Sequence, residues 1–364
     1  MIRPVLYTGD IFRLQARGGI SRYFVEVISR LERPARVLAG LHQSAMLGSL
    51  GTRVSAAARA PALPGTPRLR ALVNRAVDAS LGVASRGAIV HPTYYRDPAR
   101  LPRRAPVVIT VYDMAHERLP ALFRRRWWKS RDPAAWKAAM CARADRIVCL
   151  SESTRRDLAE FLGVPDAKTR VIHLGSTNWS AVTPALSAGL ERPFFLWVGE
   201  RQAYKNFERT LRAWAGSRAA TGTALLCVGG GALREAEREL IARAGAADRV
   251  TQRDATDAEL RWAYEHAAGL IYTSLCEGFG LPIVEAMALG CPVVAARASS
   301  LPEVGGEAAF YADPLDEASI AAAIERCLAE GRSPGRAAML VAQAQRFSWN
   351  AAAEAHERLY RELD

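Results

Sequence analysis

Short apolar runs alternate with helical patterns along most of the chain. In the first half, apolar runs of strand length lie at Val5–Tyr7, Arg36–Ala39, Ala88–His91, Val107–Val111, Ile147–Leu150 and Arg170–Leu174. Ser21–Leu31 is the clearest helix, because apolar residues recur at positions i, i+3, i+4 and i+7 from Phe24 onward. Strands that alternate with helices predict a parallel sheet with helices on both faces.

The second half repeats this alternation after a segment without clear periodicity, Ser176–Pro193, which is typical of a linker. Its predicted strands are Phe194–Val198, Ala224–Val228, Leu270–Thr273 and Pro292–Ala296. Its predicted helices are Phe207–Ala215, Ala232–Ala244, Asp257–Ala267, Pro282–Leu289, Glu317–Ala329 and Ala351–Leu363. The pattern does not assign Leu41–Arg86, which contains the loop-like run Pro61–Pro67.

These patterns predict an α/β protein with two doubly wound, Rossmann-like domains, at residues 1–180 and 190–346. We expect the C-terminal helix, at residues 350–364, to pack back on the first domain. Ligands of such sheets bind beyond the carboxyl ends of the strands, so two sheets facing each other would form a binding cleft. A fold does not fix a function, so the function has to come from residues at those strand ends.

Composition sets the limits of the search. The chain has 364 residues, of which 50% are hydrophobic and 24% charged, as in a protein with a substantial core. No apolar run approaches the roughly 18 residues of a membrane span, and the N-terminus lacks the apolar stretch of a signal peptide, so we expect a cytoplasmic protein. The six cysteines and six histidines show no metal-ligand spacing, and we expect no metal and no cofactor.

The net charge of +12 fits three kinds of partner, namely nucleic acid, an anionic membrane surface or an anionic small substrate. Charge alone does not choose among them. No recognised nucleic-acid-binding motif is present, so we expect no nucleic-acid partner.

The most informative stretch is Cys276–Val294, which follows an apolar strand. Gly278 and Gly280 bracket Phe279, and Pro282 stands where a helix would begin, since its fixed φ suits the first turn. A helix N-terminus presents free backbone N–H groups and the positive end of the helix dipole. Such a site attracts phosphate.

Two acids flank this glycine loop. Glu277 precedes it, and Glu285 is expected on the first turn of the helix. Both carboxylates can then point into one pocket, where they would suit sugar hydroxyls. The alternative is that Glu277 is a solvated loop acid and Glu285 only complements the helix N-terminus.

A second set of residues, Gly199–Arg201 and Lys205–Asn206, follows the strand that ends at Val198. A leaving nucleoside diphosphate gains negative charge as its glycosidic bond breaks. Arg201 and Lys205 can neutralise that charge through charge-assisted hydrogen bonds, without a metal. The alternative is a pair of exposed cations on a basic surface.

The stretch Cys276–Val294 resembles the E-x7-E motif of retaining glycosyltransferases of the GT-B fold, specifically those of glycosyltransferase family 4. The resemblance extends over Phe194–Trp214, Ala298–Val304 and Asp313–Pro314, and more thinly over Gly18–Arg22, Val111–Asp113 and Ser151–Thr154. It implies a retaining, metal-independent hexosyltransferase whose first domain binds the acceptor and whose second binds a nucleotide-diphosphate sugar.

The resemblance also implies roles for single residues. Glu285 would bind the ribose hydroxyls of the donor, and Glu277 would face the transferred sugar. Backbone of Gly278–Leu281 would line the donor, with Gly199 nearby, while Arg201 and Lys205 would bind the diphosphate. The family is thought to pass the acceptor proton to a donor phosphate oxygen, which fits a site without an obvious protein base.

Residues of the first half are weaker candidates. Gly18 and Gly19 lack side chains, so their backbone could approach the diphosphate, although an ordinary turn explains them nearly as well. Many relatives have a His-Asp pair where this chain has Tyr112 and Asp113, with His116 three residues on. We expect Asp113 to orient a substrate, with His116 and Tyr112 near the acceptor. The alternative for Asp113 is a turn former or helix cap.

The run Arg124–Lys129 combines cations with two tryptophans. It suits peripheral contact with an anionic membrane, where a lipid-linked acceptor would lie, or a helix with buried tryptophans and solvated arginines.

Among donors, GDP-mannose or a GDP-deoxyhexose is favoured and a UDP-sugar comes next. A glycan or lipid-linked glycan of a surface polysaccharide, such as lipopolysaccharide, is the expected acceptor. Competing functions are a nucleotide-sugar epimerase or hydrolase, a non-enzymatic nucleotide-binding protein, and a NAD-dependent oxidoreductase. The last lacks GxGxxG after the first strand.

Overall fold

The structure is a computed structural model that describes residues 2–59, 66–123, 133–185 and 192–364. The chain divides into two compact units. The first contains the described residues within 1–117 and 124–174 together with 349–364, and the second contains 118–123 and the described residues within 175–348. Within the described residues, no helix is long and apolar enough to span a membrane.

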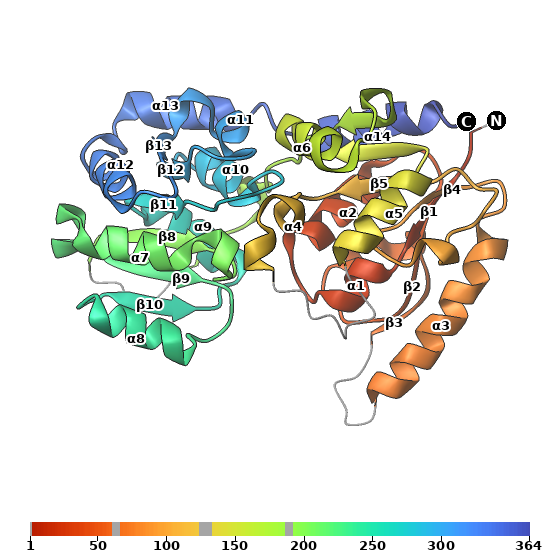
Figure 1. The fold of residues 1–364 in the computed structure, drawn as a ribbon, viewed down its shortest axis with the longest axis horizontal. Helices are drawn as coiled ribbons and strands as arrows, with labels where there is room; N and C mark the ends of the chain where they lie inside the picture. Colours follow the sequence, from red (N-terminus) through yellow and green to blue (C-terminus); the bar gives the residue numbers. More distant parts are fainter. Residues whose placement is uncertain (1, 60–65, 124–132, 186–191) are drawn as a thin grey trace. The chain divides into compact units, whose positions relative to one another are not determined.

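The first unit is built on parallel strands (Figure 1). Its strands are β1 (Val5–Thr8), β2 (Ala35–His42), β3 (Val54–Arg59), β4 (Ile89–His91), β5 (Val108–Val111), β6 (Arg146–Cys149) and β7 (Thr169–Val171). They form two ladders, β3-β2-β1-β4 and β5-β6-β7, which a parallel bridge between Val90 and Val107 connects. The order 3-2-1-4-5 is that of a doubly wound Rossmann sheet.

Helices cover this sheet. They are α1 (Asp10–Leu14), α2 (Gly19–Arg30), α3 (Thr66–Ala84), α4 (Ala115–Arg118), α5 (Pro133–Arg143), α6 (Glu152–Leu162) and α14 (Trp349–Arg361). Local sequence sets their ends. In α6, the Ser151 hydroxyl accepts a hydrogen bond from the Thr154 N–H at the start, and Gly163 adopts the left-handed conformation that ends the helix.

The second unit is a six-stranded parallel sheet. Its strands are β8 (Phe194–Val198), β9 (Ala224–Val228), β10 (Val250–Arg253), β11 (Gly269–Tyr272), β12 (Val293–Ala296) and β13 (Phe310–Ala312), in the order β10-β9-β8-β11-β12-β13. Its helices are α7 (Phe207–Gly216), α8 (Glu235–Arg243), α9 (Asp257–His266), α10 (Leu281–Ala288), α11 (Leu301–Gly305), α12 (Glu317–Glu330) and α13 (Pro334–Ala344). The prediction of two doubly wound α/β domains is therefore confirmed.

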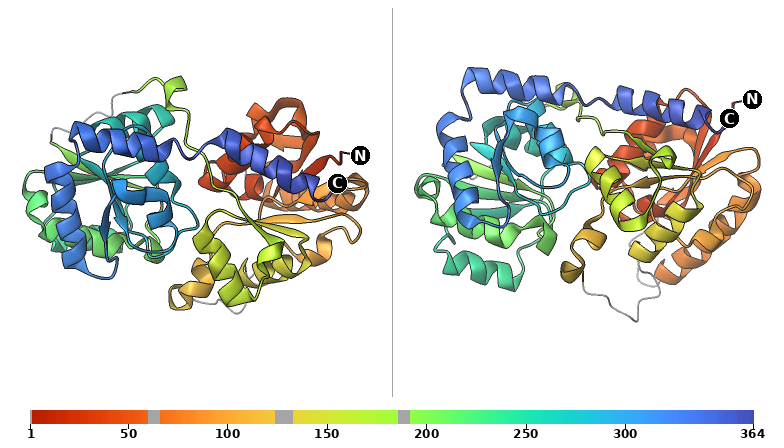
Figure 2. Two further views of the ribbon diagram at one scale, coloured as in Figure 1. Left: turned by 90° about the horizontal axis from the view of Figure 1, so that it is seen from above. Right: turned by 45° about the horizontal axis from the view of Figure 1, so that its top comes forward.

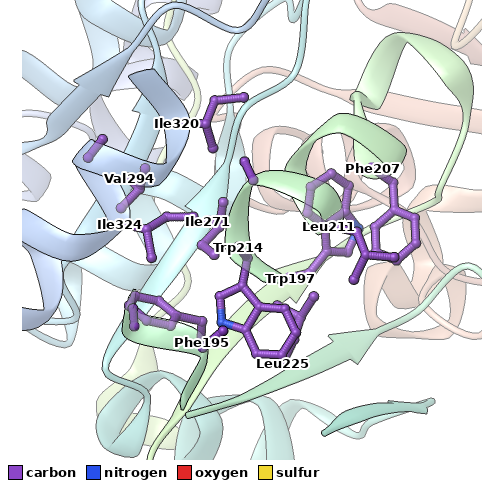
Figure 3. Close-up of a cluster of buried hydrophobic side chains, with 14 of the residues drawn as sticks. Phe195, Trp197, Phe207, Leu211, Trp214, Leu225, Ile271, Val294, Ile320 and Ile324 are labelled. Atoms are coloured by element: carbon purple, nitrogen blue, oxygen red, sulfur yellow. The ribbon is translucent and has the colours of Figure 1, made fainter. Parts of the chain in front are cut away.

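The main core of the second unit lies where α7 and α12 pack on the sheet. Figure 3 shows side chains from β8, α7, β11 and α12 gathered in one cluster that includes Phe195, Trp214, Ile271 and Ile324. Trp214 is fully buried, and its indole N–H donates to the Thr223 hydroxyl. This core fixes β8 and β11 as neighbours, and both strands lead into the candidate site.

The described part of the predicted linker belongs to the second unit. Trp179 is buried there, and its indole N–H donates to the Glu285 carbonyl at 3.1 Å. This stretch is therefore packed along α10 instead of forming a free connection.

The last helix, α14, packs in the first unit against α2. Arg33 and Glu357 form a buried ion pair at 2.8 Å, and the Arg3 N–H donates to Asp364 at 3.0 Å. Figure 2 shows the two chain ends side by side. The first unit thus takes its residues from both ends of the sequence.

A buried chain of hydrogen bonds joins α14 to β1, α2, β4 and β5. Its members are Tyr7, Tyr23, His91, Thr110, His356 and Tyr360, linked at 2.7–3.0 Å. The His356 Nδ1 lies 2.8 Å from the Ala352 carbonyl, which can only accept, so Nδ1 carries the hydrogen. Burial favours the neutral form of both histidines. With His356 neutral, its Nε2 accepts from the Tyr23 hydroxyl, and each following hydroxyl or ring can donate in turn.

We expect this network to make the first unit sensitive to acid. Burial lowers the pKa of His356 to about 4 and that of His91 well below its usual value. Unfolded histidines take up protons near pH 6.5, so below that pH the unfolded state binds more protons than the folded one. The free energy of unfolding should therefore fall by about 1.4 kcal/mol per pH unit per histidine as the pH drops from 6.5 toward 4.

Urea unfolding at several pH values measures this slope. His356→Gln should flatten it, whereas His266→Gln, a change at an exposed residue of the second unit, should leave it as it is. An equal slope in the wild type and His356→Gln would contradict the assignment.

Candidate functional site

The candidate site lies in the second unit at the carboxyl ends of β8 and β11. These strands are neighbours, yet the chain continues from β8 to β9 on one side and from β11 to β12 on the other. Where adjacent strands lead in opposite directions, their following loops separate and leave a crevice. The loops after β8 and β11 carry Lys205 and Glu277.

Lys205 and Glu277 form an ion pair within this site. The Lys205 Nζ lies 2.6 Å from the Glu277 Oε1, and the two side chains are only 17% and 12% exposed. The ammonium also lies 5.1 Å from the ring centre of Tyr204 and 5.7 Å from that of Tyr272. Burial disfavours the ammonium, but the Glu277 carboxylate and the two tyrosines outweigh it and hold the pKa of Lys205 well above its ordinary value. The site therefore keeps a fixed, partly desolvated positive charge.

The loop after β8 is tied to the loop after β11. Asn206 adopts a left-handed conformation, with φ 65°, and its side-chain amide donates to the carbonyls of Thr273 and Pro314. The Leu275 N–H donates to the Tyr204 carbonyl at 2.8 Å. These bonds set the position of Lys205 relative to Glu277.

Two serines after β12 hold the Glu277 backbone. The Glu277 N–H donates to the Ser299 hydroxyl at 2.9 Å, and the Ser300 hydroxyl donates to the carbonyls of Glu277 and Phe279 at 3.0 Å. Sequence reasoning missed this function, although both serines follow the predicted strand Pro292–Ala296. Polar residues just after a buried strand are the available signal.

The glycine loop opens α10 as expected, with one correction. Gly280 adopts a left-handed conformation, φ 103°, before the helix begins at Leu281 with Pro282 in its first turn. The first turn contains no acid, so Glu285 lies in the second turn. Phe279 is buried, with its ring 5.3 Å from that of Phe347. The side chain of Phe279 is thus part of the core.

We expect Gly280→Ala to impair this loop. A Cβ there would lie 2.9 Å from the Leu301 Cδ2, and the φ of 103° is unfavourable for an L-residue. The variant should lose about 1–2 kcal/mol of stability and raise the KM for the donor. Gly290→Ala is the matched control, because its φ of 65° is also left-handed while the nearest atom lies at an ordinary 3.6 Å. A rise in KM of equal size in both variants would show that the Leu301 contact does not matter.

Glu285 is buried on α10, with 5% of its surface exposed. Its carboxylate accepts from the Thr177 hydroxyl at 2.8 Å and from the Tyr264 hydroxyl at 3.4 Å. Glu277 and Glu285 thus have different partners.

The sequence suggested that Arg201 is accessible to the donor diphosphate, but the structure buries its side chain. Its guanidinium is buried and donates to the four carbonyls of Gly229–Ala232, at 2.8, 3.3, 2.7 and 3.2 Å. Its Nε lies 3.2 Å from the Glu237 Oε1. The three glycines of this loop all have left-handed φ values of 68–84°. Arg201 therefore braces the loop after β9 from inside the unit.

Glu237 completes this brace. Burial opposes its charge, yet hydrogen bonds from Arg234 and the charge of Arg201 hold the pKa of Glu237 below its usual value. The space around Gly230 is tight, because a Cβ there would lie 2.9 Å from the Arg201 Nη1. Gly199, at the end of β8, has a φ of 122° and open space where a Cβ would stand.

In the first unit, Gly18 precedes α2 and Gly19 is its first residue. A Cβ on Gly18 would collide with the Gln15 side chain, whereas one on Gly19 would meet nothing within 4 Å. Gly19 is therefore exposed, and its backbone is open to the approach of a diphosphate that the sequence suggested.

The residues after β5 have structural contacts. The Asp113 carboxylate accepts from the Ala115 N–H at 3.1 Å, which is the capping interaction named as its alternative role. Tyr112 is buried, and its hydroxyl donates to the Thr93 carbonyl. His116 is partly buried on α4. The burial of Tyr112 favours a packing role over contact with an acceptor.

The run Arg124–Lys129 lies outside the described residues. In the part of the chain that the structure describes, no group of three or more His, Cys, Asp or Glu side chains could hold a metal ion.

Comparisons with known proteins agree with this architecture. A family model described as "Glycosyltransferase Family 4" matches residues 17–176, and one described as "Glycosyl transferases group 1" matches residues 192–330. The O-antigen chain mannosyltransferase B of Escherichia coli is 46% identical over 94 residues. That match spans 26% of this chain and 25% of the relative.

Solved structures share the fold over nearly the whole chain. Sucrose-phosphate synthase from Thermosynechococcus elongatus is 21% identical, with a TM-score of 0.73 and 99% of both chains covered. Anabaena HepE, solved with UDP-glucose, is 17% identical, with a TM-score of 0.72 and 98% and 99% of the two chains covered. With its two domains matched by these two glycosyltransferase families on this shared fold, the chain is a glycosyltransferase of the GT-B fold.

Proposed function

We propose that the chain transfers a hexose from a nucleotide-diphosphate sugar to a glycan or lipid-linked glycan of a surface polysaccharide, without a metal and with retention at the anomeric carbon. The partly buried Lys205–Glu277 pair at the strand switch point carries this proposal, because it holds a fixed cation and a carboxylate where a doubly wound sheet binds its ligand. The similarity to an O-antigen mannosyltransferase supports the polysaccharide role.

Each proposed role follows from the contacts of the residue. When the donor binds, the Lys205 ammonium leaves the Glu277 carboxylate and pairs with the donor diphosphate. It then stabilises the negative charge that develops on the diphosphate during transfer. Glu277, released from the ammonium, accepts hydrogen bonds from hydroxyls of the transferred sugar. The Glu285 carboxylate, which accepts a hydrogen bond from the Thr177 hydroxyl, accepts from the ribose hydroxyls of the bound donor instead. Arg201 acts by holding the triglycine loop in place.

The transfer needs little covalent chemistry from the protein. The bond from the anomeric carbon to the phosphate oxygen breaks, and the acceptor oxygen bonds to the same face of the sugar. The acceptor proton passes to the departing phosphate oxygen. The protein supplies orientation and charge stabilisation.

GDP-mannose or a GDP-deoxyhexose is the favoured donor, with a UDP-sugar next, since a mannosyltransferase and a UDP-glucose complex both occur among the similar proteins. Thermal unfolding with GDP, UDP, dTDP or ADP tests this order. The correct nucleotide, at 100 times its dissociation constant, should add about 2.7 kcal/mol of stability. Lys205→Ala should lose most of that gain. If none of the four nucleotides stabilises the wild type, the proposed donor site is wrong.

Product analysis separates transfer from the competing reactions. Incubation with donor alone should leave it intact, whereas an epimerase or hydrolase would consume it. With acceptor present, the anomeric configuration of the product, read from its NMR coupling constant, tests retention.

A further inference from the structure

Helix α3 is attached to the first unit by one face. The side-chain amide of Asn74 accepts from the Leu41 N–H at 2.8 Å and donates to the Leu41 carbonyl at 3.1 Å. Asp78, one turn on, pairs with Arg13 at 3.0 Å, and Leu81 is buried. Residues at i, i+4 and i+7 thus hold α3 against β2 and its neighbours.

The opposite face of α3 is apolar and exposed. Leu69, Leu72 and Val83 are 58%, 67% and 66% exposed, and Ala76 and Ala79 between them are also exposed. Their spacing of three and four residues places all five on one side of the helix, which we call the outer stripe. Figure 1 shows α3 at the margin of the first unit. An exposed helix face is usually polar, so a continuous apolar stripe indicates a binding surface.

Cations lie along one edge of the outer stripe. At 100° per residue, Arg68, Arg75 and, just past the helix end, Arg86 fall on the same side of it, and all three are exposed. Asp78 is the single acid in the α3 sequence, and it is turned inward to Arg13 and Arg96. The outer side of α3 therefore combines apolar surface with positive charge and contains no acid.

We propose that the outer stripe of α3 binds the surface of an anionic phospholipid bilayer. The apolar side chains would enter the boundary between headgroups and acyl chains, and the arginines would bind lipid phosphates. A second copy of α3 fits less well, because arginines would face arginines with no acid to pair them. A nucleic acid would leave the leucines in water. The proposal does not depend on the reaction at Lys205.

Co-sedimentation with vesicles tests the proposal. The full-length protein should bind vesicles that contain phosphatidylglycerol at low salt, bind less as salt rises, and bind pure phosphatidylcholine poorly. Arg68→Gln/Arg75→Gln and Leu69→Ser/Leu72→Ser/Val83→Ser should each lower the partition coefficient roughly tenfold or more.

Matched controls come from the second unit. Leu315, Leu328 and Met339 are 66%, 43% and 47% exposed, so their triple change to Ser removes similar apolar surface and should leave binding unchanged. Circular dichroism and urea midpoints equal to the wild type show that the variants are folded. The proposal is overturned if the wild type does not bind anionic vesicles, or if both α3 variants bind as it does. The proposal is also overturned if the wild type is a dimer that does not bind vesicles and the variant with the three serines is a monomer in sedimentation velocity.

Discussion

Lys205→Ala should lower kcat by about 10²–10³-fold, because removal of one preorganised charge that stabilises a transition state has effects of this size. The lysine holds its charge in a partly desolvated site, 2.6 Å from Glu277, where electrostatic interactions are stronger than in bulk water. Steady-state kinetics with the preferred donor give the value.

Two further variants sharpen this result. Lys205→Arg keeps the charge but changes its reach, and should recover part of the lost activity. Arg212→Ala removes an exposed cation of the same unit whose side chain is 42% accessible and paired with Glu317, and should keep normal turnover. If Lys205→Ala has normal kcat and donor affinity, the lysine does not act on the diphosphate.

Arg201→Ala should destabilise the second unit by about 3–5 kcal/mol, since it breaks a buried ion pair and leaves Glu237 without that partner. It also removes the donor for the carbonyls of Gly229–Ala232. Urea unfolding followed by tryptophan fluorescence measures the loss.

The same variant shows whether Arg201 stabilises the loop Gly229–Ala232 or binds the donor phosphate directly. Arg201→Lys offers one ammonium in place of a planar group with several N–H donors, and should recover only a small part of the stability. Arg238→Ala, which breaks an exposed pair with Glu235, should change stability by less than about 1 kcal/mol. An Arg201→Ala protein of normal stability but low turnover would mean that the arginine acts on the substrate directly.

The sequence predicted β8 and β9 with the observed bounds, because a short apolar run between polar loops has few alternatives in a buried parallel sheet. It also placed Lys205 and Glu277 just after two strands, and these two residues meet because the carboxyl ends of parallel strands lie along one edge of the sheet. Glu285 was assigned to the wrong turn because α10 begins at Leu281, one residue before Pro282.

Two features could not be read from the pattern. α3 was missed because apolar residues lie on both of its faces, with Leu81 buried and Leu69 and Leu72 exposed, so no single apolar stripe stands out in the sequence. The inward turn of Arg201 was missed because its partners are mostly backbone carbonyls, and these are the same in every residue.

The position of α14 affects how the protein is made. The N-terminus of a chain leaves the ribosome first, and domains usually fold as units as they emerge. Here Tyr7, Tyr23 and His91 each have a buried partner on the last helix, so the first unit can reach its final packing only after the whole second unit has been translated. A chain truncated after residue 348 should therefore contain a folded second unit and a first unit that proteases still cut.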